Sequence, residues 1–80
     1  MADTAQWLTE DMRRRIGWRI KEIRELHLEV DQKAFAERIG SNQSAVSRIE
    51  RGKILPSVET VLRISEISGK ATDWILKGVA

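Results

Sequence analysis

The chain of 80 residues is predicted to fold as an all-α domain, a compact bundle of five helices. Apolar residues recur at the three- and four-residue spacing of amphipathic helices, and capping residues or glycines stand at most ends of these segments. No segment alternates apolar and polar residues as a half-buried β-strand does. A chain of this length forms a single domain.

The first helix is expected from about Glu10 to Leu28. Thr9 can cap its N-terminus, and acidic residues follow in the first turn, where the positive end of the helix dipole favours them. The apolar residues of this segment share one helical face: Met12, Ile16, Ile20 and Ile23. No glycine closes the helix, so its end near His27–Glu29 is left open.

Two short helices are expected next, at Gln32–Ile39 and Gln43–Arg51, with a tight turn at Gly40-Ser41 between them. A residue of a type that caps helix N-termini stands directly before each, Asp31 and Asn42. Gly52 stands just past the second helix, where helices often end on glycine. The residues expected to face inward are Phe35, Ala36, Ile39, Val46 and Ile49.

The last two helices are separated from this pair by Pro56-Ser57, which breaks the chain and caps a helix extending to about Ser68. Its expected inward stripe is Val58, Val61, Leu62 and Ser65, and Gly69 ends it. A short helix at Thr72–Lys77 would place three residues on or near the core: Trp74, Ile75 and Leu76. The domain is expected to span residues 10–78, between an N-terminal extension at 1–9 and a C-terminal end at 79–80.

Composition excludes several classes of function. The chain has no cysteine and one histidine, His27, so no metal site is expected. It has no nucleophile–base pair and no glycine-rich phosphate loop, so we expect neither an enzyme, nor a cofactor, nor a small-molecule substrate. No apolar run approaches the roughly 18 residues of a membrane span, and there is no secretion signal. We therefore expect a cytoplasmic protein without membrane contact.

The distribution of charge is more informative than the net charge of +2. The formal charge is −3 over residues 1–12, +2 over 13–31, +3 over 32–53 and zero over 54–80. The positive excess falls on and beside the two short central helices, as a phosphate-facing surface requires.

The segment Gln32–Gly52 has the residue sizes that a helix-turn-helix requires. Ala36 is small enough for the two helices to approach closely, and Gly40 can adopt the positive φ of the turn. Val46 and Ile49 can anchor the second helix. Its other face then exposes side chains suited to reading base edges in the major groove: Gln43, Ser44, Ser47 and Arg48.

This segment resembles the Cro/CI-type helix-turn-helix of the XRE family of phage and bacterial regulators. The matching residues are Gln32, Ala36, Gly40, Gln43-Ser44, Val46-Ser47, Ile49-Glu50 and Gly52. The resemblance continues through PSVETVLRISEISG and TDWILKG, which is similar to the end of a phage repressor's DNA-binding domain, and covers roughly residues 13–78. It implies a lambda-repressor-like fold.

The resemblance also implies roles for individual residues. The base-reading residues would be Gln43, Ser44, Ser47 and Arg48, with the amide of Gln43 suited to adenine and the guanidinium of Arg48 suited to guanine. The phosphate contacts would come from Gln32, Asn42, Arg51 and Lys53. Arg24 and Glu50 match a buried ion pair between the first and third helices, which is structural.

Several departures from the family pattern concern local packing. Ser41, Ser68 and Lys70 replace residues that are usually apolar. The connection between the first two helices is one residue longer than usual and lacks its usual glycine, which could shift Arg24 relative to Glu50. The cluster Arg13-Arg14-Arg15 with Arg19 is interpreted as a solvated helix face rather than a DNA contact.

The tryptophans leave the dimer surface open between two alternatives. Trp18 lies opposite the apolar stripe of the first helix, and Trp7 would share its side if the helix extended that far back. Trp7 and Leu8 either fold over Trp18 or form an interface there. Ile67 and Trp74 form a competing dimer surface.

The expected function is that of a sequence-specific transcriptional regulator, a repressor that binds an inverted-repeat operator in double-stranded DNA as a homodimer. The alternative is a protein-interaction module, an antitoxin or partner-binding subunit, with the same fold and little specific DNA binding. The chain is either the N-terminal part of a longer protein or a complete small regulator.

Overall fold

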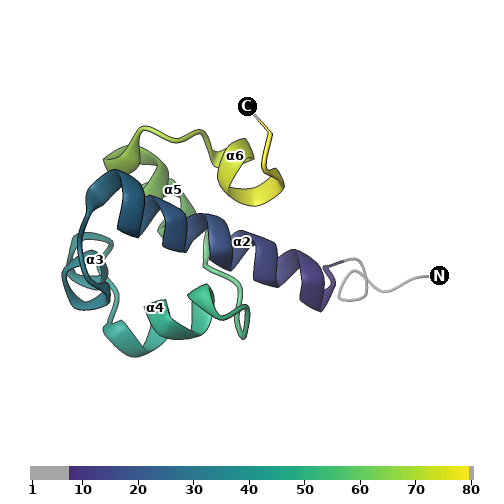
Figure 1. Cartoon of the computed structure of the whole chain (residues 1–80), viewed down its shortest axis with the longest axis horizontal. Helices are drawn as coiled ribbons and strands as arrows, with labels where there is room; N and C mark the ends of the chain where they lie inside the picture. Colours follow the sequence, from purple (N-terminus) through teal and green to yellow (C-terminus); the bar gives the residue numbers. More distant parts are fainter. Residues whose placement is uncertain (1–7, 80) are drawn as a thin grey trace.

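The computed structural model describes residues 8–79, which form five helices around one apolar core (Figure 1). The first helix consists of α2, Glu10–Glu22, continued by the π-helical segment η1, Ile23–Leu28. The others are α3 (Gln32–Arg38), α4 (Gln43–Glu50), α5 (Val58–Ser68) and α6 (Thr72–Lys77). The all-α, five-helix fold predicted from the sequence is confirmed, and α3 and α4 each end one residue earlier than predicted.

Four helices begin at the capping residues that the sequence predicts. In each case the side-chain oxygen of the cap accepts a hydrogen bond from the backbone N–H three residues further on. The caps and distances are Thr9 at 3.2 Å, Asp31 at 2.8 Å, Asn42 at 2.9 Å and Ser57 at 3.1 Å. Each such cap stabilises its helix by about 1 kcal/mol.

The core draws on every helix, and its buried apolar residues are Ile16, Ile20, Ile23, Phe35, Ala36, Ile39, Val46, Ile49, Val61, Ile64 and Ile75. The predicted stripe of α5 was wrong in part, because Val58 and Leu62 are 77% and 56% exposed while Ile64 is fully buried. Apolar residues lie on two sides of this helix. Packing against η1 and α6 selects the side of Val61 and Ile64, a choice that periodicity within one helix does not determine. In α6, Ile75 is buried, Trp74 is half-buried and Leu76 is exposed.

Two glycines allow the first helix to press against the C-terminal end of α4. A Cβ atom on Gly17 would lie 2.2 Å from the carbonyl oxygen of Ile49, closer than any side chain can approach. A Cβ on Gly52 would lie 2.8 Å from the Cα of Arg14, and Gly52 also has a φ of 74°. Gly52 was predicted as a helix end, whereas the close approach at Gly17 was not predicted.

The π-helical segment η1 accommodates the extra residue between the first two helices. The N–H of Glu29 donates to the carbonyl of Arg24, five residues earlier, instead of the four-residue spacing of an α-helix. Glu29 takes the left-handed conformation (φ 54°) that a glycine usually supplies, at a cost of about 1–2 kcal/mol. The additional residue is thus accommodated within the helix. The shift of Arg24 relative to Glu50 that the longer connection could have caused does not occur.

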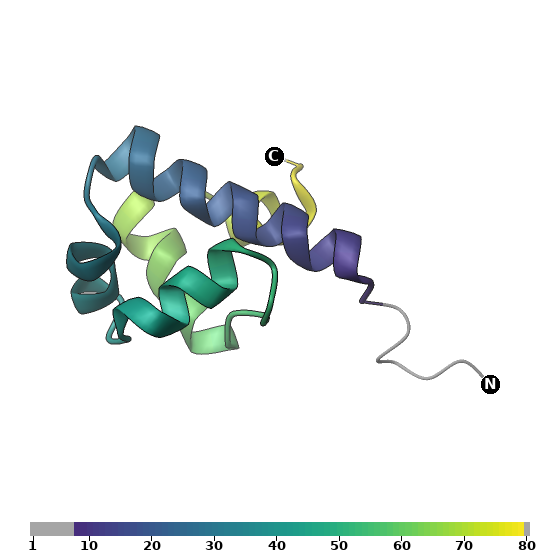
Figure 2. The same cartoon turned by 60° about the horizontal axis from the view of Figure 1, so that its bottom comes forward.

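The helices place α4 and α6 on opposite sides of the first helix. Figure 1 shows α4 along the lower side of α2 and α6 along the upper side, with α3 at the far end. The turned view of Figure 2 shows α4 on the near surface, with no other helix in front of it. Within residues 8–79, no helix is both long and apolar enough to cross a membrane. The molecule therefore presents α4 as an uncovered helix on one of its faces.

Candidate nucleic-acid interface

The outer face of α4, defined as Gln43, Ser44, Ser47 and Arg48, brings together the residues predicted to read bases. Three of them are exposed, and Ser47 is half-buried. On the opposite side of the helix, Val46 and Ile49 are 1% and 6% exposed and anchor α4 in the core. A uniformly polar outer face on an anchored, uncovered helix is the arrangement that docks in a DNA major groove.

Arg48 lies along this face rather than extending into solvent. Its Nη2 donates a 3.1 Å hydrogen bond to the Oγ of Ser44, one helical turn earlier. This is the sole hydrogen bond of the Arg48 side chain among residues 8–79, and the guanidinium forms no ion pair with them. An exposed hydrogen bond to a hydroxyl has a small net free energy, so Arg48 can exchange it for a base. The guanidinium keeps further N–H donors for a bidentate contact.

The C-terminal end of α4 is closed by a Schellman motif that fixes the backbone beside Arg51 and Lys53. The N–H of Gly52 donates to the carbonyl of Ile49 at 3.0 Å, and the N–H of Lys53 donates to that of Arg48 at 2.9 Å. Both basic side chains are exposed, and the Nε of Arg51 donates to the carbonyl of Ser47 at 3.3 Å. Arg51 and Lys53 therefore place two positive charges at the C-terminal end of α4.

The two amides predicted to contact phosphate already make contacts within the chain. The Oδ1 of Asn42 caps α4 by accepting from the N–H of Ala45. The Nε2 of Gln32 donates to the Oε1 of Glu50 at 3.1 Å. An amide nitrogen carries two N–H groups, so each side chain is held in place and keeps a donor for a phosphate oxygen.

The structure brings Arg24 and Glu50 together in a bidentate ion pair. The Nε and Nη2 of Arg24 donate to the two carboxylate oxygens of Glu50 at 2.7 and 3.0 Å, and its Nη1 donates to the carbonyl of Val30 at 3.0 Å. The side chains are only 9% and 3% exposed. The hydrogen bonds that Arg24 donates to Glu50, opposed by burial, raise the pKa of the Arg24 guanidinium above its ordinary value. With Gln32, this pair ties α4 to both preceding helices.

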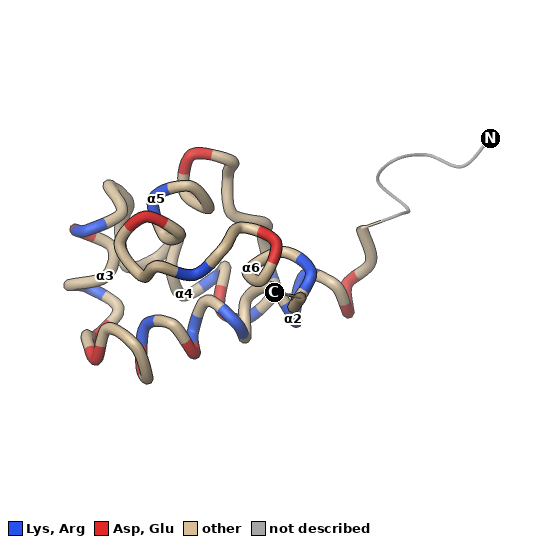
Figure 3. Tube along the Cα trace, turned by 90° about the horizontal axis from the view of Figure 1, so that it is seen from above, with Lys and Arg blue, Asp and Glu red and all other residues tan. Residues whose placement is uncertain are grey.

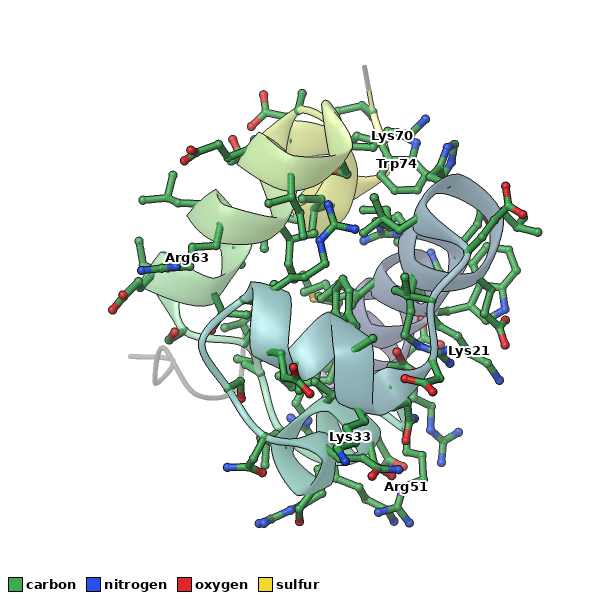
Figure 4. The ribbon with its side chains drawn as sticks, turned by 90° about the vertical axis from the view of Figure 1, so that its left-hand side faces the viewer. Lys21, Lys33, Arg51, Arg63, Lys70 and Trp74 are labelled. Atoms are coloured by element: carbon green, nitrogen blue, oxygen red, sulfur yellow. The ribbon has the colours of Figure 1, made fainter. Side chains whose placement is uncertain are left out.

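Lys33, which was not among the predicted phosphate contacts, lies on the same side of the molecule as α4. Figure 4 shows Lys33, from the first turn of α3, and Arg51 both at the lower edge of the molecule, on the side formed by α4. Arg63 and Lys70 lie on other sides. Lys33 directly follows Gln32, which was predicted to contact a phosphate, and this adjacency was an available signal. The first helix also carries basic and acidic positions (Figure 3), with five basic residues and no acidic one between residues 13 and 21.

Within the part of the chain that the structure describes, the titratable side chains do not form a metal-binding site. No group of three or more histidine, cysteine, aspartate or glutamate residues is positioned to hold a metal ion there. No buried side-chain nitrogen or oxygen of these residues lacks a hydrogen-bond partner.

The chain is similar to known proteins over most of its length. The family model described as helix-turn-helix matches residues 20–75, from the first helix to α6. Among solved structures, the chain is similar to the P22 c2 repressor protein in complex with synthetic operator 9T in the presence of Tl⁺. The two sequences are 31% identical, the TM-score is 0.73, and the match covers 80% of this chain and 96% of the repressor chain. No curated protein sequence matches the chain.

Proposed function

The chain belongs to the helix-turn-helix family, as a Cro/CI-type DNA-binding regulator of transcription and not an enzyme, and from this premise we propose that it is a repressor. In this proposal it binds an inverted-repeat operator as a homodimer, with one recognition helix in each half-site. Repression follows when the bound dimer occludes the promoter. Double-stranded DNA as the target fits a cytoplasmic location.

The observation that carries this proposal is the outer face of α4. The helix is anchored by buried residues, and its exposed residues begin at its N-terminal end, which enters the groove first in this motif. The amide of Gln43 suits adenine and the guanidinium of Arg48 suits guanine, each worth about 1–3 kcal/mol against a wrong base. Ser44 and Ser47 supply short hydroxyl contacts beside them.

Phosphate contacts at both ends of α4 would set its depth and register in the groove. Asn42 lies at its N-terminal end, Gln32 of α3 contacts Glu50 in its last turn, and Arg51 and Lys53 follow at its C-terminal end. We add Lys33 to this set because it shares the side of α4 in Figure 4. Such contacts position the protein without reading sequence.

The homodimer needs a contact surface beside α4, because both recognition helices have to face the same side of the DNA. The exposed apolar residues nearest the α4–α5 connection meet this need: Leu55 at 38%, Val58 at 77% and Leu62 at 56%. Val58 and Leu62, together with Leu76 of α6, border an apolar hollow of about 270 Å³. We propose this surface, the α5 face, for the subunit contact.

The two surfaces considered from the sequence fit this role less well. Trp74 is half-buried, and the Nζ of Lys70 lies 4.7 Å from the centre of its ring, so little of it is free for a partner. Ile67 is likewise packed against the core. Trp18 is 64% exposed, but Trp7, which would extend its surface, lies outside the described residues.

The test of base reading is a selection of binding sites from random double-stranded DNA, followed by titration of the selected site. Gln43→Ala and Arg48→Ala should each weaken binding by about 1–3 kcal/mol and relax preference at one base position. Arg63→Gln is the matched control, since Arg63 is exposed on another side of the molecule. Equal binding of selected and scrambled DNA, unaffected by either variant, would favour a protein-interaction module instead.

The test of the homodimer compares the sedimentation of two single variants, Val58→Asp and Trp18→Ala, with that of the parent chain. A carboxylate at Val58 would have to lose its hydration in the subunit contact, so this variant should sediment as a monomer and bind one half-site. Trp18→Ala should leave the dimer intact. Loss of the dimer in Trp18→Ala alone would move the contact to the first helix.

A further inference from the structure

A pocket of about 480 Å³ lies between α2 and α6, on the opposite side of the first helix from α4 (Figure 1). Its lining residues are Arg14, Arg15, Trp18, Arg19, Trp74 and Gly78. Ligand pockets span roughly 300–1,000 Å³, so this volume accommodates a molecule with one or two rings. Nothing in the proposed DNA contacts uses this pocket.

Two indole rings form its apolar surface. Trp18 is 64% exposed, an unusually open position for the largest side chain. Trp74 is half-buried against the core and is held from its other side by the ammonium group of Lys70. The two side chains come from α2 and α6, and the exposed ring of Trp18 offers a flat surface on which an aromatic ring can stack.

Arg19 connects α2 to α6 and so holds the two helices that line the pocket together. Its Nε and Nη2 donate to the carbonyls of Ile75 and Leu76 at 2.8 and 3.0 Å, which satisfies the C-terminal end of α6. Burial, and then the charge of Arg15, lower the pKa of the Arg19 guanidinium below its ordinary value. Arg19 is therefore structural and adds positive potential to the pocket.

The rim carries two arginines with exchangeable partners. Arg15 pairs with Asp11 at 3.0 Å and Arg14 pairs with Glu10 at 2.7 Å, and all four side chains are about two-thirds exposed. Ion pairs this exposed contribute little free energy, so an incoming anion can replace either carboxylate. Every charged residue that lines the pocket is an arginine. The pocket thus selects for negative charge as well as for an aromatic ring.

We propose that this pocket binds a small aromatic carboxylate. Its ring stacks on Trp18 and its carboxylate accepts the fork of N–H donors from Arg15, in place of Asp11. A concave site with so few lining residues fits a small molecule better than a peptide or a second subunit. Because α4 lies on the other side of the first helix, ligand and DNA can be bound together.

The first experiment titrates the 80-residue chain with 2-naphthoate in a calorimeter. Two comparison compounds separate the contributions: 2-naphthamide keeps the ring without the charge, and cyclohexanecarboxylate keeps the charge without the aromatic ring. We expect saturable one-site binding of naphthoate, with both comparison compounds at least about tenfold weaker. Equal binding of the amide would reduce the pocket to a general apolar surface and overturn the proposal.

The second experiment repeats the titration with variants. Trp18→Ala should weaken naphthoate binding at least about tenfold, and Arg15→Gln about fivefold. Asp11→Asn should strengthen it by about two- to fivefold, because it removes the carboxylate that competes for Arg15. Leu26→Ala, which alters an exposed apolar residue outside the pocket, should have no effect.

The signs of these changes separate a binding role from a structural one. All four side chains are largely exposed, so thermal unfolding should be nearly unchanged in every variant. Unchanged affinity in both Trp18→Ala and Arg15→Gln would overturn the proposal. So would sedimentation showing that Trp18→Ala dissociates the protein without ligand, because the pocket would then be covered by a second copy.

Discussion

The side of α4 that faces the first helix and the side that faces solvent use their polar groups in opposite ways. At the junction of the first helix with α4, defined as Gly17, Arg24, Glu50 and Gly52, each of the three guanidinium nitrogens of Arg24 donates a hydrogen bond and the helices touch backbone to backbone. On the outer face, Arg48 makes a single exposed hydrogen bond. Arginine thus has two roles: Arg24 holds the helices together, whereas Arg48 keeps donors available for a ligand.

This difference predicts that stability and DNA binding can be changed separately. Substitutions at the junction should unfold the domain while leaving the chemistry of the outer face intact. Substitutions on the outer face should alter binding in a domain that remains folded. The variants below test this separation, beginning with the largest expected effect.

Glu50→Ala should be the most damaging single change. It leaves the buried guanidinium of Arg24 without its partner and removes the acceptor of Gln32, which typically costs about 3–5 kcal/mol. Urea unfolding followed by circular dichroism measures the loss. The matched control is the double variant Arg24→Met with Glu50→Leu, which removes both charges and should recover most of the stability. A single variant as stable as the parent would show that the pair is not structural.

Gly17→Ala should destabilise the domain by about 1–3 kcal/mol through overpacking. The new methyl group would force α2 away from the carbonyl of Ile49. Lys21→Ala, on the exposed side of the same helix, should change stability by less than about 0.5 kcal/mol. Thermal unfolding compares the two, and equal melting temperatures would contradict the close contact at this crossing.

Arg51→Gln and Lys53→Gln should weaken binding to selected and random DNA alike. Each loses one proposed phosphate contact, so the slope of log affinity against log salt should decrease in magnitude by about one unit per variant. Fluorescence anisotropy at several salt concentrations measures it, with Lys70→Gln as a control on another side of the molecule. A change confined to the selected site would instead assign base reading to these residues.

Ser44→Ala should have the smallest effect. It removes the hydroxyl that holds Arg48 along the helix, an exposed contact that contributes less than about 0.5 kcal/mol to folding. DNA binding should weaken by at most about 1 kcal/mol, since Arg48 keeps its donors. A loss as large as that of Arg48→Ala would show that Ser44 reads a base directly.

Local signals in the sequence were sufficient to predict most of the fold. The caps Thr9, Asp31, Asn42 and Ser57 and the glycine at position 52 act through neighbouring backbone groups, so sequence alone locates them. The face that α5 buries was not predictable in this way. Two sides of that helix are similarly apolar, and contacts with distant helices determine which one is buried.

The site shows the same division between local and distant information. The composition of the outer face of α4 follows from helical spacing within eight residues. The contact of Gly17 with α4 depends on Ile49 and Glu50, more than thirty positions away, and within its own segment Gly17 resembles a weak helix former. The pocket between α2 and α6 also combines distant segments, so neither Trp18 nor Arg15 identifies it alone.

The π-helical segment has a consequence for insertions and deletions. Arg24 and Gln32 both donate to the carboxylate of Glu50, and each is held by its own helix. The number of residues between them therefore does not determine these contacts. Removing one exposed residue, such as Leu26, would convert the segment to ordinary α-helix while both partners of Glu50 keep their places. Related domains can thus differ in length here, and an alignment that ignores this would shift the first helix by one position.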